Sequence, residues 1–190
     1  TSWSLSVLAF QMLRQSNFRA LYISATLEQA WDKLEQFEEI CRRSWRLEGM
    51  VKKKDEGKGA WRKGAKYFNN GSRVHAASIG KALEGPHVHL IILDDVLQEF
   101  PNLTDEKVIH YIKRVVMPMR LPDASLLLVG TQKRVEDVTD WVTESPRWST
   151  LRHPALLENG TPRWPEYWSL ERLEEERETM GSRAFESEYL

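Results

Sequence analysis

The sequence has a single cysteine, Cys41, among its 190 residues. One cysteine cannot form a disulfide within the chain, which excludes a disulfide framework and suits a reducing, intracellular compartment. The sequence also lacks a run of about 18 uncharged apolar residues, the length that a membrane span requires, and a basic-then-apolar leader. Internal repeats and low-complexity tracts are absent as well. We therefore expect a globular domain with no membrane partner, and a hydrophobic content of 41% is enough to build its core.

Strong net charge is lacking too, because the chain carries a formal charge of −1, but the charges are unevenly distributed. Residues 42–66 hold ten Lys or Arg and three acidic residues, a local balance of +7, whereas residues 171–190 hold seven Glu and three Arg. The basic stretch predicts a loop that contacts the phosphates of DNA, and a solvated lysine-rich loop explains it equally well. The candidate contact residues are Lys52, Lys53, Lys54, Arg62 and Lys63.

Strands and helices alternate along the chain, which is typical of an α/β fold with a mainly parallel sheet. Apolar patterns and capping residues predict strands over 19–24, 90–93 and 125–130 and helices over 26–43, 104–116 and 169–181. The strands 90–93 and 125–130 are apolar throughout, so we expect both to be buried on both faces. Asn70-Gly71 favours a β-hairpin, which would be inserted before the strand 90–93.

The stretch from His89 to Asp95 is the most informative, because Leu90 to Leu93 lead directly into two adjacent carboxylates. In open parallel sheets, ligands bind at the carboxyl ends of the strands, and nucleotide-hydrolysing ATPases present their Walker B acids in this way. Asp94 would then bind Mg²⁺ and Asp95 would orient the attacking water. An ordinary strand-to-turn junction, in which Asp caps the next element, explains the same pattern. His87 and His89 could share one face, but two ligands without a third favour packing over a metal site.

Further motifs follow a fixed order along the chain. They are Gly71–Ser78, Gly85-Pro86-His87 before Leu90–Asp95, Leu127–Gln132, and the tail segments Arg163–Glu166, Ser169–Leu173 and Gly181–Leu190. Together they resemble the ATPase domain of the large terminase subunits of tailed bacteriophages. The resemblance covers nearly the whole chain, and the ordered set is more specific than any single motif.

The resemblance implies a P-loop NTPase core of the RecA/ASCE type over residues 1–145, with a helical, Trp- and Pro-rich tail over 146–190 that leads toward a nuclease domain. Thr1 would be the hydroxyl residue that follows the lysine of the phosphate-binding loop, and would bind ATP and, with Asp94, Mg²⁺. Without that lysine the chain should bind ATP poorly. Gly130, Thr131 and Gln132 occupy the position of the coupling motif, which senses the γ-phosphate; a strand-ending turn would look the same.

The resemblance also implies a function, namely Mg²⁺-dependent ATP hydrolysis that drives double-stranded DNA into a procapsid. Such motors work in the host cytoplasm as a homo-oligomeric ring, with the portal protein and the small terminase subunit as partners. Many relatives have Glu where Asp95 stands and Arg where Glu84 stands, so no arginine finger is assigned. Two alternatives stay open: a helicase-type DNA-translocating ATPase, and a noncatalytic capsid or DNA-binding module in which the two aspartates are structural.

Overall fold

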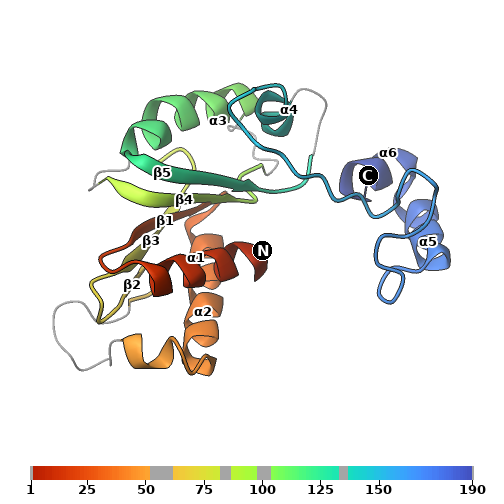
Figure 1. Cartoon of the computed structure of the whole chain (residues 1–190). Helices are drawn as coiled ribbons and strands as arrows, with labels where there is room; N and C mark the ends of the chain where they lie inside the picture. The colour runs from red at the N-terminus through yellow and green to blue at the C-terminus, as the bar shows by residue number, and fades with distance from the viewer. Residues whose placement is uncertain (1, 52–61, 82–86, 98–103, 133–136, 190) are drawn as a thin grey trace. The chain divides into compact units, whose positions relative to one another are not determined.

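The computed structural model describes residues 2–51, 62–81, 87–97, 104–132 and 137–189 (Figure 1). The chain forms two compact units, Thr1–Gly130 and Thr131–Leu190. The first unit contains a five-stranded sheet and the helices that cover it. The described part of the second unit contains three helices: α4 (Val138–Thr143), α5 (Leu170–Met180) and α6 (Ser182–Tyr189).

The sheet has the strand order β2-β3-β1-β4-β5, and all neighbouring strands are parallel except β2 and β3. This arrangement confirms the predicted α/β fold with a mainly parallel sheet. The predicted hairpin is also present, but its second strand is an integral parallel member of the sheet, next to β1. The strands are β1 (Arg19–Ser24), β2 (Ala65–Tyr67), β3 (Arg73–Ser78), β4 (Val88–Asp94) and β5 (Arg120–Val129).

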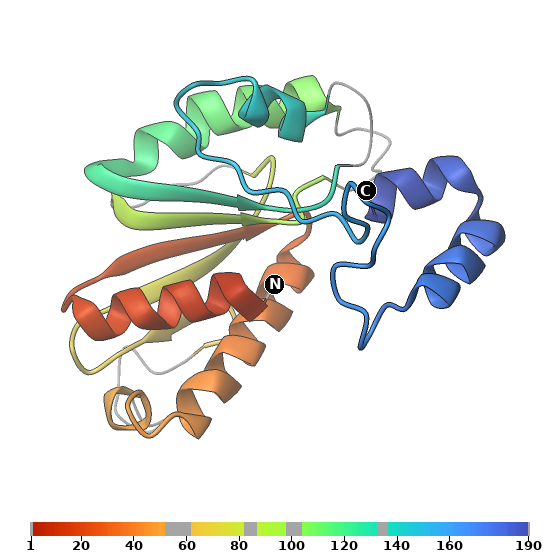
Figure 2. The same cartoon turned by 45° about the vertical axis from the view of Figure 1, so that its right-hand side comes forward.

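Helices cover both faces of the sheet (Figure 2). α1 (Ser2–Arg14) and α2 (Leu27–Arg43) lie on one face, and α3 (Asp105–Tyr111) lies on the other and continues as a π-helix and a 3₁₀ turn (Ile112–Val116 and Met117–Met119). Another 3₁₀ turn, Glu48–Met50, follows α2. A cluster of buried apolar residues joins the α1 and α2 face to the sheet, and its members include Leu5, Leu8, Met12, Tyr22, Leu34, Phe37 and Ile92.

The helix starts follow the predicted caps. The Thr26 hydroxyl accepts a hydrogen bond from the Gln29 amide at 3.2 Å, and the Gln29 side chain accepts one from the Thr26 amide at 3.1 Å. This capping box satisfies two amides that the first turn of α2 leaves without partners. The Ser169 hydroxyl caps α5 by accepting a hydrogen bond from the Arg172 amide, and Gly181 ends that helix with a φ of 82°. The helices predicted at 26–43 and 169–181 are therefore confirmed.

The burial predicted for the last strand is wrong. Leu126 to Val129 are only half-buried in β5, whereas Leu90 to Leu93 in β4 are fully buried as predicted. The reason is position in the sheet. Among the strands that the structure describes, β5 pairs only with β4 and forms the edge of the sheet, whereas β4 lies between β1 and β5. An apolar run identifies a strand but does not distinguish a central strand from an edge strand.

Within the described residues, none of the helices combines the length and the hydrophobicity that crossing a bilayer requires. The single cysteine is buried in the core on α2, where burial raises the pKa of the Cys41 thiol to about 12. A thiol in that state is a poor nucleophile, so Cys41 contributes packing to the fold.

A buried lysine gives the first unit a pH-dependent contact. The Lys66 ammonium, on β2, is almost fully buried and donates to a Glu38 carboxylate oxygen at 2.7 Å, and Arg42 donates to the other oxygen at 2.9 Å. Burial opposes ionisation of Glu38, but the hydrogen bonds from Lys66 and Arg42 outweigh it and lower the pKa of Glu38. A carboxyl with a lowered pKa in the folded state stabilises the fold above its unfolded pKa of about 4.3, and this contribution is lost as pH falls through the folded pKa.

Glu38→Gln should therefore destabilise the fold at pH 7 and weaken the loss of stability below about pH 4.3. We expect a loss of roughly 2 kcal/mol, less than the 3–5 kcal/mol of a fully buried pair, because Glu38 keeps partial exposure. Urea unfolding between pH 3 and 7 measures both effects. Glu39→Gln is the matched control, since Glu39 pairs with an exposed Arg43 at 3.6 Å. Equal stability of the two variants at pH 7 would contradict the assignment.

Candidate active site

The parallel strands end in one row at the carboxyl edge of the sheet. Ser78 of β3 pairs with Ser24 of β1, and Asp94 of β4 pairs with Val129 of β5. Ile23 of β1 pairs with Leu93 of β4. The next residues of the two strands, Ser24 and Asp94, therefore also lie beside each other. The row therefore brings polar side chains from three neighbouring strands to the edge where α/β folds bind ligands.

Asp94 is buried, with 1% of its surface exposed, and its two carboxylate oxygens differ in their surroundings. Oδ2 accepts a hydrogen bond of 2.6 Å from the Tyr22 hydroxyl. Oδ1 is buried without any hydrogen-bond partner. A buried carboxylate oxygen without a partner is costly, and such atoms in a folded protein commonly mark the place of an ion or an ordered water.

The Tyr22 hydroxyl connects Asp94 to the start of α1. Burial, with the hydrogen bond to Asp94 next in size, raises the pKa of Tyr22 above its ordinary value, so the phenol stays protonated and donates to the carboxylate. The buried Ser4 hydroxyl lies 3.1 Å from the same phenol oxygen. Because Tyr22 has only one proton, Ser4 must be the donor in that contact. The chain Ser4–Tyr22–Asp94 thus fixes the orientation of the acid relative to the first turn of α1.

Ser24 is the second buried polar group at this edge, and its hydroxyl has no hydrogen-bond partner. The Ser24 hydroxyl and Asp94 Oδ1 are the only buried side-chain polar atoms without partners among the described residues. Oxygen atoms of carboxylates and hydroxyls, directly or through water, are the ligands that Mg²⁺ prefers. In the described part of the chain no three His, Cys, Asp or Glu residues form a ready-made metal cluster. The donors present therefore fit a hydrated Mg²⁺ that a bound ligand helps to hold.

Asp95 stands just beyond the strand, with an exposed side chain and a φ of 48°. This left-handed conformation is uncommon for residues other than glycine, and Asn and Asp tolerate it best. The Asp95 amide donates to the Val129 carbonyl at 2.9 Å, which extends the β4–β5 ladder by one residue. The strand therefore holds the backbone of Asp95, while its carboxylate is presented to solvent beside the buried Asp94.

The three residues of the predicted coupling motif lie at the boundary of the two units. Gly130 ends the first unit, and a β-carbon at this position would lie 3.8 Å from Asp95 Oδ1. Gln132 belongs to the second unit, where its side-chain amide donates to both Asp140 carboxylate oxygens at 3.0 Å. The Gln132 carbonyl accepts a hydrogen bond of 3.0 Å from Ser187 of α6. Thr131 joins these two environments along the chain.

Some of the residues that the sequence analysis singled out lie outside the described part of the chain. They are Thr1, Glu84, Lys52, Lys53 and Lys54. Of the two remaining basic-loop residues, Arg62 is exposed and forms a backbone bridge with Ala65, and the Lys63 ammonium lies 4.7 Å from the centre of the Trp31 ring.

Of the two histidines, His89 packs and forms a hydrogen bond, as the sequence favoured, whereas His87 is exposed. His89 stacks on Phe18 with ring centres 5.2 Å apart, and its Nδ1 accepts a hydrogen bond of 3.0 Å from the Arg19 amide. Sequence reasoning missed Ser4, Tyr22 and Ser24 as site residues. Only Ser24 carried a signal, because it is the polar last residue of an apolar strand.

Solved structures share this arrangement of strands and helices. The chain superimposes on the large terminase ATPase domain of Thermus phage P74-26 with a TM-score of 0.56 and 16% identity, over 98% of this chain and 80% of that one. An Arg-to-Ala mutant of the same domain gives a TM-score of 0.55 and 14% identity, over 98% and 83%. The chain has the fold of a large terminase ATPase domain. No family model matches the sequence, and no curated protein does.

The resemblance of the sequence motifs implied the fold of a terminase ATPase domain, and the superposition confirms that fold. The two aspartates lie at the carboxyl end of β4, a strand with neighbours on both sides in the mainly parallel sheet. At 14–16% identity, the superposition establishes the fold, and the roles of individual residues depend on their own chemistry.

Proposed function

We propose that the chain is the ATPase domain of a terminase large subunit, the motor that drives double-stranded DNA into a procapsid. The observation that carries this proposal is Asp94, a buried acid at the carboxyl edge of the sheet with one oxygen held by Tyr22 and the other without a partner. A purely structural aspartate would have both oxygens satisfied by the protein. The likeness of the fold to a terminase ATPase domain supports the same reading.

Asp94, Tyr22 and Asp95 have separate roles in the proposed hydrolysis. Asp94, whose Oδ1 has no hydrogen-bond partner, would hold the Mg²⁺ shell, with Thr1 as the second protein ligand expected in the phosphate-binding loop. Mg²⁺ would supply charge neutralisation at the phosphates of ATP. Tyr22 prevents rotation of the Asp94 carboxylate, which preorganises the site before the nucleotide arrives. Asp95, exposed and one residue farther on, orients the attacking water.

Coupling to DNA movement would pass through Gly130, Thr131 and Gln132. Gly130 lies beside the carboxylate of Asp95, the residue that in this proposal orients the attacking water. Gln132 is tied to Asp140 of α4 and Ser187 of α6, both in the second unit. In the assembled motor we propose a ring of copies that contacts the portal protein and the small terminase subunit in the host cytoplasm.

Steady-state ATP hydrolysis by the full-length protein tests this function. We expect phosphate release that requires Mg²⁺ and that duplex DNA accelerates. The measurement is phosphate release with and without EDTA and with and without a mixed-sequence duplex. Folded full-length protein that binds DNA but releases no phosphate would favour the noncatalytic alternative. Unwinding of a tailed duplex, in place of transport of an intact one, would favour the helicase alternative.

The basic loop yields a separate prediction for DNA affinity. Replacing Lys52, Lys53 and Lys54 by Gln removes three charges that can neutralise backbone phosphates. If all three contact DNA, the slope of log K against log salt concentration should become shallower by about 2.7, at roughly 0.9 for each contact. Fluorescence anisotropy with a 20-base-pair duplex between 50 and 200 mM salt measures that slope. An unchanged slope in the triple variant would exclude the loop as a DNA contact.

A further inference from the structure

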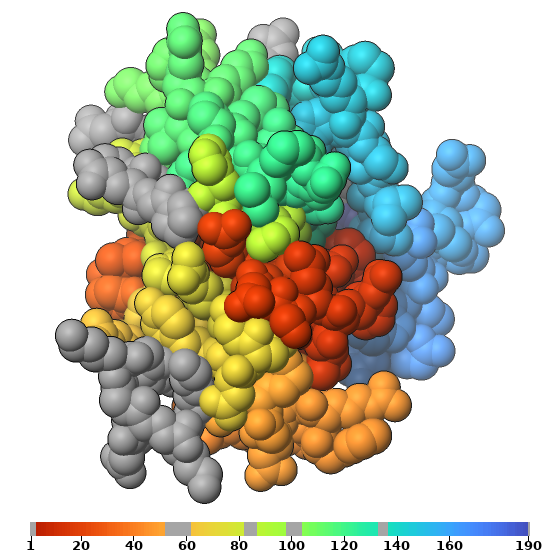
Figure 3. Space-filling view, turned by 60° about the vertical axis from the view of Figure 1, so that its left-hand side comes forward, coloured from red at the N-terminus to blue at the C-terminus, as the bar shows by residue number. Residues whose placement is uncertain are grey.

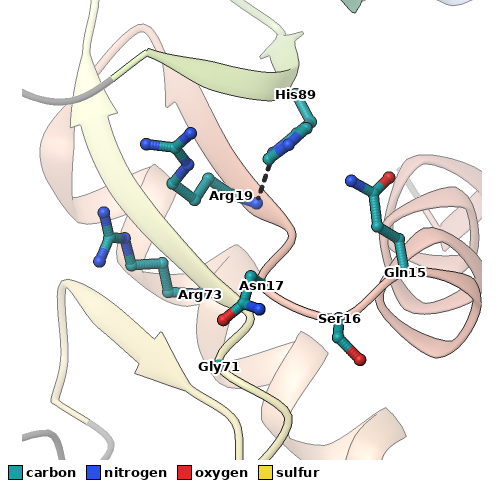
Figure 4. A pocket seen from close by; sticks show the side chains of 7 residues that line it. All are labelled: Gln15, Ser16, Asn17, Arg19, Gly71, Arg73 and His89. Carbon is teal, nitrogen blue, oxygen red and sulfur yellow. Dashed lines mark hydrogen bonds between the residues drawn. The ribbon is translucent and has the colours of Figure 1, made fainter.

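A polar cavity of about 350 Å³ lies at the opposite, amino-terminal edge of the sheet (Figure 4). It is lined by the turn between α1 and β1 and by the first residues of three strands: Gln15, Ser16, Asn17, Arg19, Arg73 and His89, with Gly71 beside them. Figure 3 turns this edge toward the viewer, and the red end of α1 lies there between the yellow hairpin and the green segments. Arg19 and Ser24 are five residues apart on β1, so the cavity is roughly 17 Å from the Asp94 edge.

Two arginines dominate the chemistry of this cavity. Arg19 and Arg73 are directly opposite each other in the register of β1 and β3, and Figure 4 shows their side chains lying side by side. Like charges directly opposite across two strands repel each other. Within the described residues neither guanidinium has an ion pair or a side-chain hydrogen bond, and no carboxylate lines the cavity. The adjoining hollow, which shares Gln15 and His89, has one aspartate, Asp123.

The surrounding groups favour an anion. Gln15 and Asn17 add amide donors to the two guanidinium forks. Burial, and next the charge of Arg19, lower the pKa of His89; burial, and next Arg73, lower the pKa of His75. Both shifts are consistent with the positive potential of two arginines without counter-charges. Guanidinium pairs match the geometry of phosphate oxygens through bidentate hydrogen bonds.

The backbone at this cavity is also held in an uncommon conformation. Asn17 has a φ of 58° and Gly71 a φ of 81°, and the Asn17 amide donates to the Asn70 carbonyl at 2.9 Å. A β-carbon on Gly71 would collide with the Asn17 side chain, so this position requires glycine. The Asn70 side chain donates to the Met12 carbonyl at 2.9 Å, which fastens the hairpin to the end of α1. The turn before β1 and the hairpin, which both line the cavity, are therefore fastened to each other and to α1 by hydrogen bonds.

We propose that Arg19 and Arg73 form a second phosphate-binding site, separate from the ATP site. The phosphate comes either from the backbone of DNA or from a free polyphosphate. The DNA source rests on the proposed function, because it presumes a protein that contacts DNA. The polyphosphate source is independent of that function.

The test compares the full-length protein with Arg19→Gln, Arg73→Gln and the double variant. Arg43→Gln is the matched control, because it removes one highly exposed guanidinium from α2, outside the cavity. Without ATP, we measure binding of a 20-base-pair duplex across a salt series, and the shift of melting temperature that pyrophosphate produces relative to chloride at equal ionic strength. Among the described residues the guanidiniums of Arg19 and Arg73 have no ion pair, so the melting temperature without ligand should not fall in these variants. This measurement also checks that the variants fold.

If DNA is the source, the double variant should bind the duplex at least about tenfold more weakly, with a salt slope shallower by about 1–2, and the control should match the wild type. If a polyphosphate is the source, the double variant should lose the shift of melting temperature that pyrophosphate produces, while its duplex binding should match that of the wild type. Wild-type behaviour of the double variant in both measurements would overturn the proposal. Failure of ATP hydrolysis would leave the two binding measurements unaffected, so the proposals fail separately. Arg73→Lys, which keeps the charge but not the fork, should retain part of either response.

Discussion

Asp95→Asn should lower the rate of ATP hydrolysis by at least about 100-fold while ATP binding stays unchanged, because orienting the attacking water needs the carboxylate. Asparagine is close in size to aspartate and tolerates the left-handed backbone at φ 48° equally well, so the backbone of the site is preserved. The Asp95 side chain is exposed, so the substitution does not place a neutral group in the core. The change thus removes the carboxylate and keeps a side chain of similar size.

Single-turnover hydrolysis and nucleotide binding in the full-length protein measure the two halves of this prediction. A lower kcat with unchanged ATP affinity is the expected split, since the water is held only on the path to the transition state. Asp123→Asn, an exposed aspartate near the start of β5, is the matched control and should retain full turnover. Full turnover in Asp95→Asn would show that another group orients the water.

Asp95→Glu separates chemistry from backbone strain. Glutamate restores the carboxylate and is common at this position in the family that the sequence resembles. Glutamate adopts the left-handed conformation less readily than aspartate, because this conformation costs residues other than Gly, Asn and Asp about 1–2 kcal/mol. The structure therefore gives a local reason for aspartate at this place: the ladder bond from its amide to Val129 holds a φ that aspartate tolerates.

Individual strands, helix starts and the hairpin turn could be predicted from the sequence because local patterns determine them. The apolar run before Asp94, the capping threonine at position 26 and the Asn70-Gly71 turn each act over a few residues, and each is present in the structure. Strand order depends on contacts between distant segments, which these patterns do not contain. For that reason β5 was predicted as buried on both faces, although it is an edge strand among those described.

The site was predictable only in part for the same reason. Asp94 and Asp95 follow a recognisable strand, so their edge of the sheet could be deduced. Tyr22 lies in the middle of an apolar strand, where its sequence context is that of any core aromatic residue. Its role arises because β1 and β4 are neighbours, which brings its hydroxyl within 2.6 Å of Asp94. Arg19 and Arg73 likewise are 54 positions apart in sequence and become neighbours only through the β1–β3 register.

Asp94→Asn should stabilise the protein in the absence of Mg²⁺ and abolish ATP turnover, a combination that a structural aspartate would not show. The buried carboxylate has one hydrogen bond, from Tyr22, and one oxygen without a partner. The asparagine carbonyl can still accept from Tyr22, while the cost of a buried charge disappears. We expect a gain of about 1–2 kcal/mol in unfolding free energy, because a buried charge without full hydrogen bonding is costly.

Mg²⁺ with nucleotide should reverse the order of stability of the wild type and Asp94→Asn. With Mg²⁺ and nucleotide, the wild type should gain stability according to the fraction of sites filled, and Asp94→Asn should gain little, because its amide is a poor ligand for a hard cation. Urea unfolding of the full-length protein in EDTA and in Mg²⁺ with ADP measures this crossover. Asp123→Asn, at an exposed position of β5, is the control and should leave stability in EDTA unchanged. If Asp94→Asn is less stable than the wild type in EDTA, the carboxylate serves the fold, and the proposal that its unpartnered oxygen is reserved for Mg²⁺ fails.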